Sequence, residues 1–231
     1  MIAGIIFDKD GTLFDFRLSW GGWTADLLRA LTTGPEAAEL LGKVIGYDLA
    51  TGVFAPDSPV IAATPHDIAD HLLPHLPGQS RAGLVDRMTA LSAATKMQPA
   101  VPLLPLLSQL RARGLTIGLA TNDTEAPARA HLSAAGILHL FDFVAGCDSG
   151  FGAKPAPGQL LAFAARFGLD AVQVAMVGDS RHDLLAGRAA GMQAVAVLTG
   201  IADAADLAPH ADVVLPDISA LPQWIDRVSA A

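Results

Sequence analysis

Short apolar runs recur along the chain, and each is followed by a glycine or a small polar residue. Within a run the residues are apolar without a break, rather than alternating with polar ones. This pattern is typical of strands that are covered on both faces. We therefore predict buried strands at residues 2–7, 115–120, 143–145, 174–177, 194–198 and 213–215.

Amphipathic stretches separate most of these runs and predict helices. They cover residues 103–113, 125–135, 158–167 and 183–190. Strands that alternate with helices imply right-handed crossovers, and so a parallel sheet with helices on both faces. The pattern therefore predicts the α/β class.

Residues 15–92 interrupt this alternation, because they contain no convincing buried strand. Helical pieces joined by loops rich in Gly and Pro occupy the interval instead, at residues 22–32, 36–45, 65–73 and 81–94. We predict a discontinuous α/β core (1–14 and 93–231) with an inserted α-helical cap (15–92). Ligands bind at the carboxyl ends of strands in open α/β sheets, so a cap that follows the first strand would cover that edge.

Composition and charge exclude several classes of protein. The 15 Lys and Arg residues against 23 Asp and Glu give a net charge of −8, which leaves no broad basic surface for nucleic acid. No apolar run approaches the ~20 residues that span a bilayer, and the first residues lack the basic segment of a signal peptide. The single Cys147 cannot form an intramolecular disulfide, which suits a reducing compartment. We expect a cytoplasmic protein with no nucleic-acid or membrane partner, either a monomer or a homodimer.

Two carboxylates follow the first predicted strand directly. Asp8 and Asp10 lie two residues apart in the segment DKDGT, and Gly11 permits a tight turn there. A turn with solvated acids is the alternative, but the position at the end of a buried strand favours a functional site. We expect the side chain of Lys9 to point away from Asp8, although an ammonium so near could lower the pKa of Asp8.

Polar residues also follow later strands. Thr121 and Asn122 could hold a phosphate together with the N–H groups of the next helix, although they would serve equally well as a helix N-cap. Lys154 stands between Gly and Pro residues in GAKPAP, which holds it on a stiff loop. An ordinary surface lysine is the alternative.

Asp179 and Asp183 follow a buried strand and lie one helical turn apart, so both can face one point. Helix capping would explain one of these acids but not both. With Asp8 and Asp10 they place four carboxylates near one edge of the sheet, where two carboxylates at about 4 Å repel by about 4 kcal/mol at an effective dielectric constant near 20. Such a cluster requires a cation, and oxygen ligands without His or Cys favour Mg²⁺ over zinc. A Mg²⁺ ion together with Lys154 would suit a phosphate dianion.

The four motifs, in this order and spacing, resemble the haloacid dehalogenase-like superfamily. The most similar branch is its phosphoglycolate-phosphatase-like hydrolases with a helical cap after the first motif. The resemblance covers most of the core, whereas the cap matches only in length and helical character. It implies a Rossmann-like core and a Mg²⁺-dependent phosphatase that acts on a small phosphorylated metabolite, with 2-phosphoglycolate as the leading substrate. The motifs read IIFDKDGTLFD, LATND, AKPAPG and VGDSRHDLLAGRAAGM.

The resemblance also implies roles for the motif residues. Asp8 would attack phosphorus and form an aspartyl-phosphate, and Asp10 would act as general acid and then general base. Mg²⁺ would be held by the carboxylates of Asp8 and Asp179 and by the main-chain carbonyl of Asp10. Asp183 would lie in the metal shell or just outside it. The phosphate-binding residues would be Thr121, Asn122 and Lys154.

Other functions fit the same scaffold. Dehalogenation does not need the second acid, so Asp10 argues for phosphoryl chemistry. A sugar phosphomutase shares both acids and remains an alternative. A catalytically silent binding protein is a further alternative, although such proteins have usually lost an acid or the lysine.

The cap offers weaker signals. Trp20 and Trp23 could shape a substrate pocket, although this spacing more often means core packing. Basic residues of the cap could meet a substrate carboxylate, although each is more often a solvated charge; they include Arg17, Arg29 and Lys43. A group that resembles a metal cluster is interrupted by a proline and consists of His66, Asp67, Asp70, His71 and His75. Residues 14–17 and 91–101 are the expected hinges of the cap.

Overall fold

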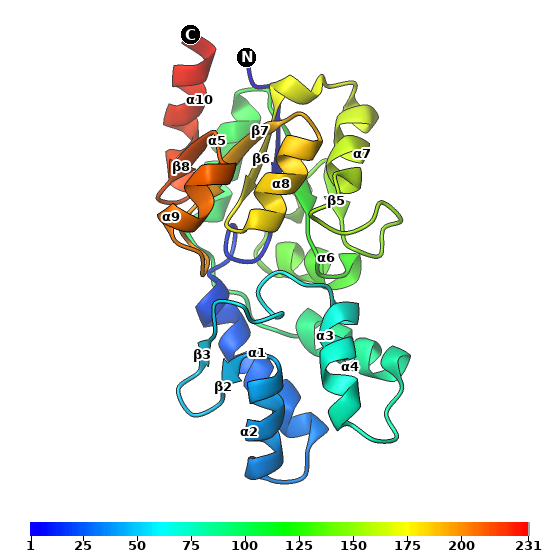
Figure 1. Cartoon of the computed structure of the whole chain (residues 1–231). Coiled ribbons are helices and arrows are strands. Elements are labelled where there is room, and N and C mark those ends of the chain that lie inside the picture. Colours follow the sequence, from blue (N-terminus) through cyan, green and yellow to red (C-terminus); the bar gives the residue numbers. More distant parts are fainter. Residues whose placement is uncertain (231) are drawn as a thin grey trace.

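Parallel strands form the larger lobe in the computed structural model, which describes residues 1–230 (Figure 1). The strands of this sheet are β1 (Gly4–Phe7), β4 (Thr116–Ala120), β5 (Phe143–Ala145), β6 (Val174–Gly178), β7 (Gln193–Val197) and β8 (Val213–Leu215). Their order in the sheet is β5-β4-β1-β6-β7-β8, and every neighbouring pair is parallel. Each predicted run overlaps one of these strands, so the predicted α/β class with a Rossmann-like parallel sheet is confirmed.

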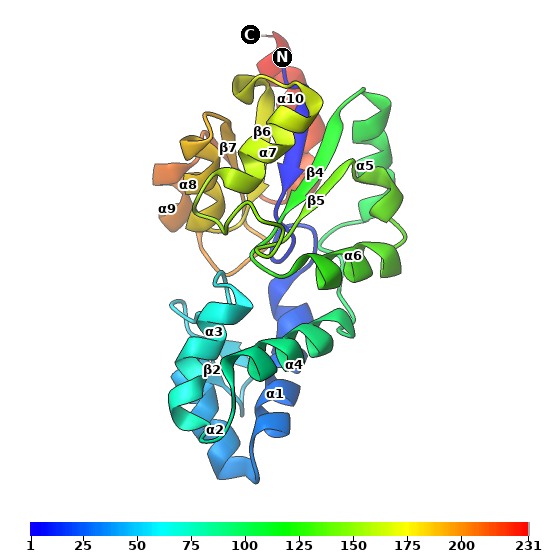
Figure 2. The same cartoon turned by 90° about the vertical axis from the view of Figure 1, so that its right-hand side faces the viewer.

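Helices cover both faces of this sheet, which explains why the strand sequences are apolar without a break (Figure 2). Ile5 and Phe7 of β1 pack on one face with α5 (Leu103–Ala112), α6 (Glu125–Ala134) and α10 (Leu221–Ala230). Ile6 points to the other face, which packs against α7 (Gly158–Phe167) and α8 (Arg181–Ala189). The short helix α9 (Ala204–Leu207) lies beside α8.

The chain runs outward from β1 through β4 to β5, and then returns to build β6, β7 and β8 on the other side of β1. The direction of winding therefore reverses at β1. Such a reversal opens a crevice at the carboxyl ends of the strands. The loops after β1, β4 and β6 meet at this crevice.

Residues 15–92, which we call the cap, supply most of the smaller lobe. They contain α1 (Phe16–Leu31), α2 (Pro35–Val44), α3 (Pro65–Leu72) and most of α4 (Arg81–Ala93). The strands β2 (Tyr47–Asp48) and β3 (Val53–Phe54) form a small antiparallel pair that the sequence pattern did not indicate. This lobe has its own cluster of buried side chains and lies at the carboxyl end of the sheet, away from both chain ends (Figures 1 and 2).

Two chain segments connect the lobes and are hydrogen-bonded to each other. The N–H of Asp15 donates to the carbonyl of Gln98 at 2.8 Å, and the N–H of Ala100 donates to the carbonyl of Leu13 at 2.9 Å. These contacts lie within or beside the two expected hinges. Movement of the cap about them stays a prediction.

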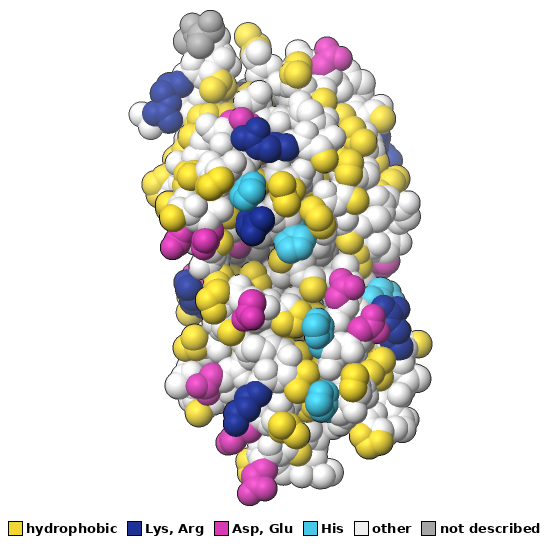
Figure 3. Space-filling model, in the orientation of Figure 1, with side chains coloured by type: hydrophobic (Ala, Val, Ile, Leu, Met, Phe, Trp, Pro, Cys, Tyr) yellow, Lys and Arg dark blue, Asp and Glu magenta, His cyan; other side chains and the backbone are white. Residues whose placement is uncertain are grey.

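On the face in Figure 3, Lys and Arg side chains are scattered rather than gathered in one broad patch. Within residues 1–230, no helix is both long enough and apolar enough to cross a membrane.

Candidate active site

The first acidic motif leaves β1 through a tight turn. Asp8 is buried directly after the strand, and the N–H of Phe14 closes the turn by donating to the carbonyl of Lys9 at 3.1 Å. Gly11 has a φ of +86°, a conformation that favours glycine. A Cβ atom at Gly11 would lie 2.2 Å from Oδ2 of Asp179. The turn therefore brings the β1 motif against the acidic motif that follows β6.

Lys154 reaches the same point from the loop after β5. Its Nζ donates to Oδ1 of Asp8 at 2.5 Å, to Oδ1 of Asp183 at 2.6 Å and to the carbonyl of Ala120 at 2.8 Å. Burial alone would lower the pKa of Lys154, but the carboxylates of Asp183 and Asp8 raise it. The lysine is thus a buried, charged group bound between two carboxylates, not a surface residue.

Asn122 holds this lysine in place. Its side-chain amide donates to the carbonyl of Lys154 at 2.9 Å and accepts from the N–H of the same residue at 2.8 Å. The other amide hydrogen is donated to the carbonyl of Ala62 in the cap at 2.8 Å. The side chain of Asn122 is therefore engaged with main-chain groups at both ends, and its expected contact with phosphate stays a prediction.

Thr121 lies at the end of β4 and faces the site. Its hydroxyl oxygen accepts from the N–H of Asp123 at 3.1 Å, an arrangement that leaves the hydroxyl hydrogen for another acceptor. The residue is almost fully buried and lines the cavity described below. The geometry suits a donor to a ligand oxygen.

Asp179 and Asp183 bring two further carboxylates to Asp8. One oxygen from each of the three residues lies within 4.8 Å of the others. Asp183 also completes a capping box with Ser180, whose N–H and hydroxyl donate to Oδ2 at 3.0 and 2.7 Å. Since Oδ1 of Asp183 accepts from Lys154, both of its oxygens already have partners.

A divalent cation fits this cluster. Burial raises the pKa of Asp8 to about 7, even though Lys154 beside it acts in the opposite direction. Burial, together with the charges of Asp8 and Asp183, raises the pKa of Asp179 well above its usual value. The raised pKa values show that the carboxylates are buried away from water and repel each other. A cation bound by their oxygen atoms would relieve this repulsion.

Asp10 faces the junction between the lobes. Its Oδ1 accepts from Nε1 of Trp20 in helix α1 at 2.8 Å, and its Oδ2 lies 3.3 Å from Nζ of Lys9. The side chain of Asp10 retains some exposure, at 15%. Both oxygens are thus oriented, one of them by the cap.

Lys9 is fully buried, and its partners come from distant parts of the chain. Its Nζ donates to Oδ2 of Asp123 at 2.6 Å, lies 3.0 Å from Nδ1 of His131 and lies 5.2 Å from the ring centre of Trp20. The hydroxyl of Ser92 in α4 donates to the same oxygen of Asp123 at 3.0 Å. The lysine therefore joins core and cap, while Lys154 is the cation that acts directly on Asp8.

These side chains surround a cavity of about 60 Å³ between the lobes. Asp8, Asp10, Thr121 and Lys154 line its core side. Cap side chains that are mostly apolar line the other side, among them Phe16, Trp20, Trp23, Val60, Ile68 and Met88. Trp20 and Trp23 also belong to the buried cluster of the cap, so they both pack its core and shape the cavity.

The basic residues of the cap that could have met a substrate carboxylate do not line the cavity. The side chains of Arg17, Arg29 and Lys43 are exposed and do not line this cavity. His182 is exposed at the rim. The guanidinium of Arg17 donates to the carbonyl of Gly200 at the same sheet edge at 3.4 Å, so Arg17 is held outside the cavity, and none of the three cations lines it.

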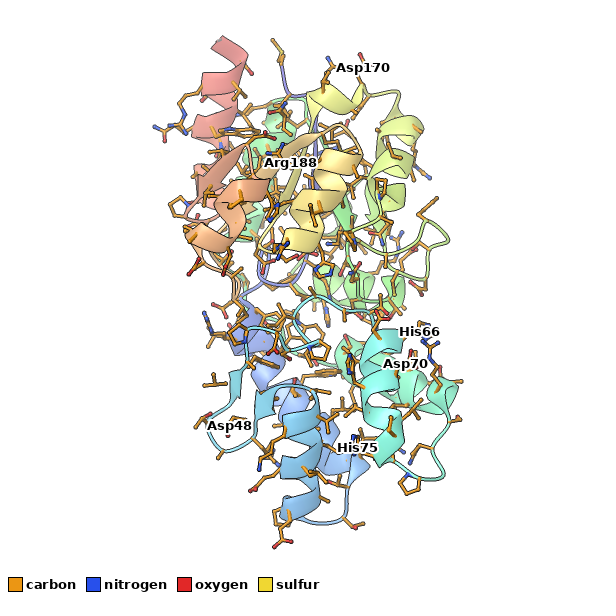
Figure 4. The ribbon with its side chains drawn as sticks, viewed as in Figure 1. Asp48, His66, Asp70, His75, Asp170 and Arg188 are labelled. Carbon is orange, nitrogen blue, oxygen red and sulfur yellow. The ribbon has the colours of Figure 1, made fainter. Side chains whose placement is uncertain are left out.

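The histidine-rich segment of the cap does not form a metal site. Arg81 donates to both carboxylate oxygens of Asp70 at 2.6 and 2.7 Å and lies 3.1 Å from Nδ1 of His66. His66 and Asp70 lie together on the outer side of α3, with His75 farther along the lobe (Figure 4). Among residues 1–230, the group whose ligand atoms lie close enough together to hold a metal ion consists of Asp8, Asp179 and Asp183.

Several residues of the site escaped the sequence reasoning. His131 meets Lys9, and Ser92 meets Asp123 beside it, only through the tertiary fold, and neither residue stands in a motif. Gly200 follows β7 at the same sheet edge, and a Cβ there would lie 1.7 Å from Oδ2 of Asp179. Its position after a buried strand was the one sequence feature that could have identified Gly200 as part of the site.

Comparisons with known proteins agree with this geometry. Residues 2–191 match the family model described as haloacid dehalogenase-like hydrolase. The chain is 34% identical over 206 residues to the probable phosphatase IndB of Dickeya dadantii (strain 3937), covering 85% of this chain and 81% of that protein. It is 30% identical over 248 residues to the phosphoglycolate phosphatase of Shigella dysenteriae serotype 1 (strain Sd197), covering 95% and 91%.

A solved structure, a predicted phosphoglycolate phosphatase from Haemophilus somnus 129PT, has the same fold. It superposes with a TM-score of 0.75 at 19% identity, covering 97% of this chain and 98% of that chain. The resemblance noted from the four motifs is confirmed, including the phosphoglycolate-phosphatase-like branch. The chain belongs to the haloacid dehalogenase-like hydrolases.

Proposed function

We propose that this chain is a Mg²⁺-dependent phosphatase that hydrolyses a small phosphomonoester through an aspartyl-phosphate on Asp8. The observation that carries the proposal is the position of Asp8. It lies at the point where the winding of the sheet reverses, bonded to Lys154 and within 4.8 Å of the carboxylates of Asp179 and Asp183. This arrangement pairs a nucleophile with a fixed cation and a site for a metal ion.

In the first step, a carboxylate oxygen of Asp8 attacks phosphorus and the bond from phosphorus to the ester oxygen breaks. Asp10 gives its proton to that oxygen, so the leaving group departs as an alcohol. In the second step, water attacks phosphorus and gives a proton to Asp10. The bond between phosphorus and Asp8 then breaks, which releases phosphate and restores both side chains.

The other residues of the cavity bind the phosphoryl group or orient the groups that act on it. Lys154 and the hydroxyl of Thr121 bind the transferred phosphoryl oxygens, where charge accumulates in the transition state. Asn122 holds the main chain of Lys154 and so positions its ammonium. Trp20 orients Asp10 through the hydrogen bond to Oδ1.

Mg²⁺ would be held by the carboxylates of Asp8 and Asp179 and by the main-chain carbonyl of Asp10. When bound, it neutralises charge and orients the phosphoryl group. Asp183 has partners at both oxygens, so we assign it to orienting Lys154 rather than to the ligand set. A cytoplasmic location completes the proposal and is supported by the single, unpaired cysteine.

The site favours hydrolysis over the two alternatives. A sugar phosphomutase must bind many hydroxyl groups, whereas the cap wall of the cavity is mostly apolar. A silent binding protein has no need for the carboxylates and the lysine, which are all present and lie together. 2-Phosphoglycolate is the compound with which other esters are compared, because several relatives carry the name phosphoglycolate phosphatase.

The Asp8→Asn variant tests this proposal. We expect turnover to be abolished with the fold intact, since the amide is a poor nucleophile and nearly isosteric. Asp170→Asn is the matched control, because Asp170 is exposed and lies near the far end of the core lobe, where both chain ends emerge (Figure 4). Phosphate release and circular dichroism are measured for both. Substantial activity in Asp8→Asn would refute the assignment of the nucleophile.

A further inference from the structure

The cavity is charged on one side and uncharged on the other. Its core side holds the carboxylates and Lys154, where the phosphoryl group would bind. Its cap side consists mainly of aromatic and aliphatic side chains, among them Phe16, Trp20, Trp23, Val60, Ile68 and Met88. A bound phosphomonoester must therefore place its leaving group against the cap wall.

The cations near this wall already have partners. Lys154 is bound between Asp8 and Asp183, and Lys9 is bound to Asp123 and lies beside Asp10. The remaining lining residue that can carry positive charge is His182, which is exposed at the rim next to the metal cluster rather than on the cap. Arg17 of the cap donates to the carbonyl of Gly200 at 3.4 Å and does not line the cavity. A carboxylate on the leaving group would therefore find no cation among the cap residues that line the cavity.

The polar groups on the cap side of the cavity do not supply a positive charge either. The hydroxyl of Ser92 donates to Asp123. The indole Nε1 of Trp23 is buried and has no acceptor among residues 1–230, but it is a neutral donor. The carboxylates of Asp10 and Asp123 also line the cavity and would repel a second anion. A charged group that loses its water without gaining a counter-ion binds poorly.

We infer that the substrate of this site is a phosphate monoester of a small, uncharged and mainly apolar alcohol, and that 2-phosphoglycolate is a poor substrate. The inference rests on the proposed phosphatase function and specifies its leaving group. A cavity of about 60 Å³ limits the size of that group. The apolar wall gains free energy from burying alkyl surface, and it excludes a carboxylate because no cation offsets the loss of hydration.

The test compares isobutyl phosphate with 2-phosphoglycolate, whose organic parts contain the same number of non-hydrogen atoms. Phosphate release in Mg²⁺ gives kcat/KM for each. We expect isobutyl phosphate to be favoured by at least about tenfold, the scale on which an apolar pocket separates small groups. Equal rates, or a preference for 2-phosphoglycolate, would overturn the inference while leaving the phosphatase function intact.

A variant of the wall sharpens the test. Val60→Lys adds a cation at a loop position of the cap, and Val60→Met is the matched uncharged control. The ratio of kcat/KM for 2-phosphoglycolate to that for isobutyl phosphate should rise by about tenfold or more in Val60→Lys only, since the added charge would pair with the carboxylate. An equal change in both variants would contradict the charge argument. If Val60→Lys does not fold, the ratio of kcat/KM for the two esters in the wild type still tests the inference.

Binding to Asp8→Asn separates this inference from the proposed function. That variant keeps the cavity but lacks the nucleophile, so the affinities of the two esters can be measured by calorimetry in Mg²⁺ even where nothing is hydrolysed. Tighter binding of isobutyl phosphate supports the apolar leaving group. Tighter binding of 2-phosphoglycolate refutes it, and absence of turnover by the wild type refutes the phosphatase function alone.

Discussion

Lys9 shows how one side chain ties the active-site motif to the cap. Its ammonium is fully buried, with Asp123 at 2.6 Å and Asp10 at 3.3 Å. Burial would lower the pKa of Lys9, but the charges of Asp10 and Asp123 outweigh that effect and raise it. The charged form is thus stabilised by its partners, and each partner depends on the lysine in return.

Replacing this lysine should destabilise the fold. We expect Lys9→Met to lower the free energy of unfolding by about 3 kcal/mol, because Asp123 would be left as a buried charge without its cation. Urea unfolding measures the change. The double variant Lys9→Met/Asp123→Asn should recover part of the loss, since the stranded charge is removed. A loss below about 1 kcal/mol would mean that the pair behaves like a surface ion pair.

At the scale of elements, the site is built from strand ends and the turns that follow them. Asp8, Thr121 and Asp179 each follow a different strand of one sheet, so the order of the strands brings them together. Glycines in these turns let the main chain approach the carboxylates closely. Gly200 after β7 is the tightest case, because a Cβ there would lie 1.7 Å from Oδ2 of Asp179.

Filling that space should weaken metal binding. Gly200→Ala would push the carboxylate of Asp179 out of place, so we expect the affinity for Mg²⁺ to fall by about tenfold or more. The Mg²⁺ concentration that half-restores phosphate release measures this effect. Gly22→Ala is the control, because Gly22 is exposed in α1 with nothing within 4 Å of an added Cβ. Equal Mg²⁺ requirements in the two variants would contradict the argument.

The elements were predictable from sequence where a local pattern determines them. The core strands are continuous apolar runs, and the acids and Lys154 stand at their ends or on the loops that follow. The start of α1 was predicted too late, because Asp15 caps the helix by accepting from the N–H of Leu18, and the pair Gly21-Gly22 then lies inside it. The burial of Lys9 was not predictable, since its partners Asp123 and His131 come from distant parts of the chain.

At the scale of the whole molecule, the two lobes enclose a cluster of carboxylates that is unfavourable without a cation. Burial raises the pKa of Asp8 to about 7, above the ~3.9 of an unfolded chain. The folded state therefore favours the protonated acid. The stability that this group contributes is present below about pH 4 and is lost as the pH rises towards 7. The pKa of Asp179 is raised as well, so its effect has the same sign.

Mg²⁺ should reverse this loss. Because the ion binds the carboxylates and not the acids, we expect it to raise Tm more at pH 8 than at pH 5. Thermal unfolding at both pH values, with Mg²⁺ and with EDTA, checks the difference. Asp179→Asn should lose most of the gain at pH 8. An equal gain at both pH values would show that Mg²⁺ acts elsewhere on the protein.

Phosphate release tests the central claim most directly. The wild-type protein is incubated with a panel of small phosphomonoesters, including p-nitrophenyl phosphate, isobutyl phosphate and 2-phosphoglycolate, first in Mg²⁺ and then in EDTA. We predict release from at least one ester in Mg²⁺, its loss in EDTA and its return when Mg²⁺ is added back. Release that persists in EDTA, or no release from any ester in Mg²⁺, would contradict a Mg²⁺-dependent phosphatase.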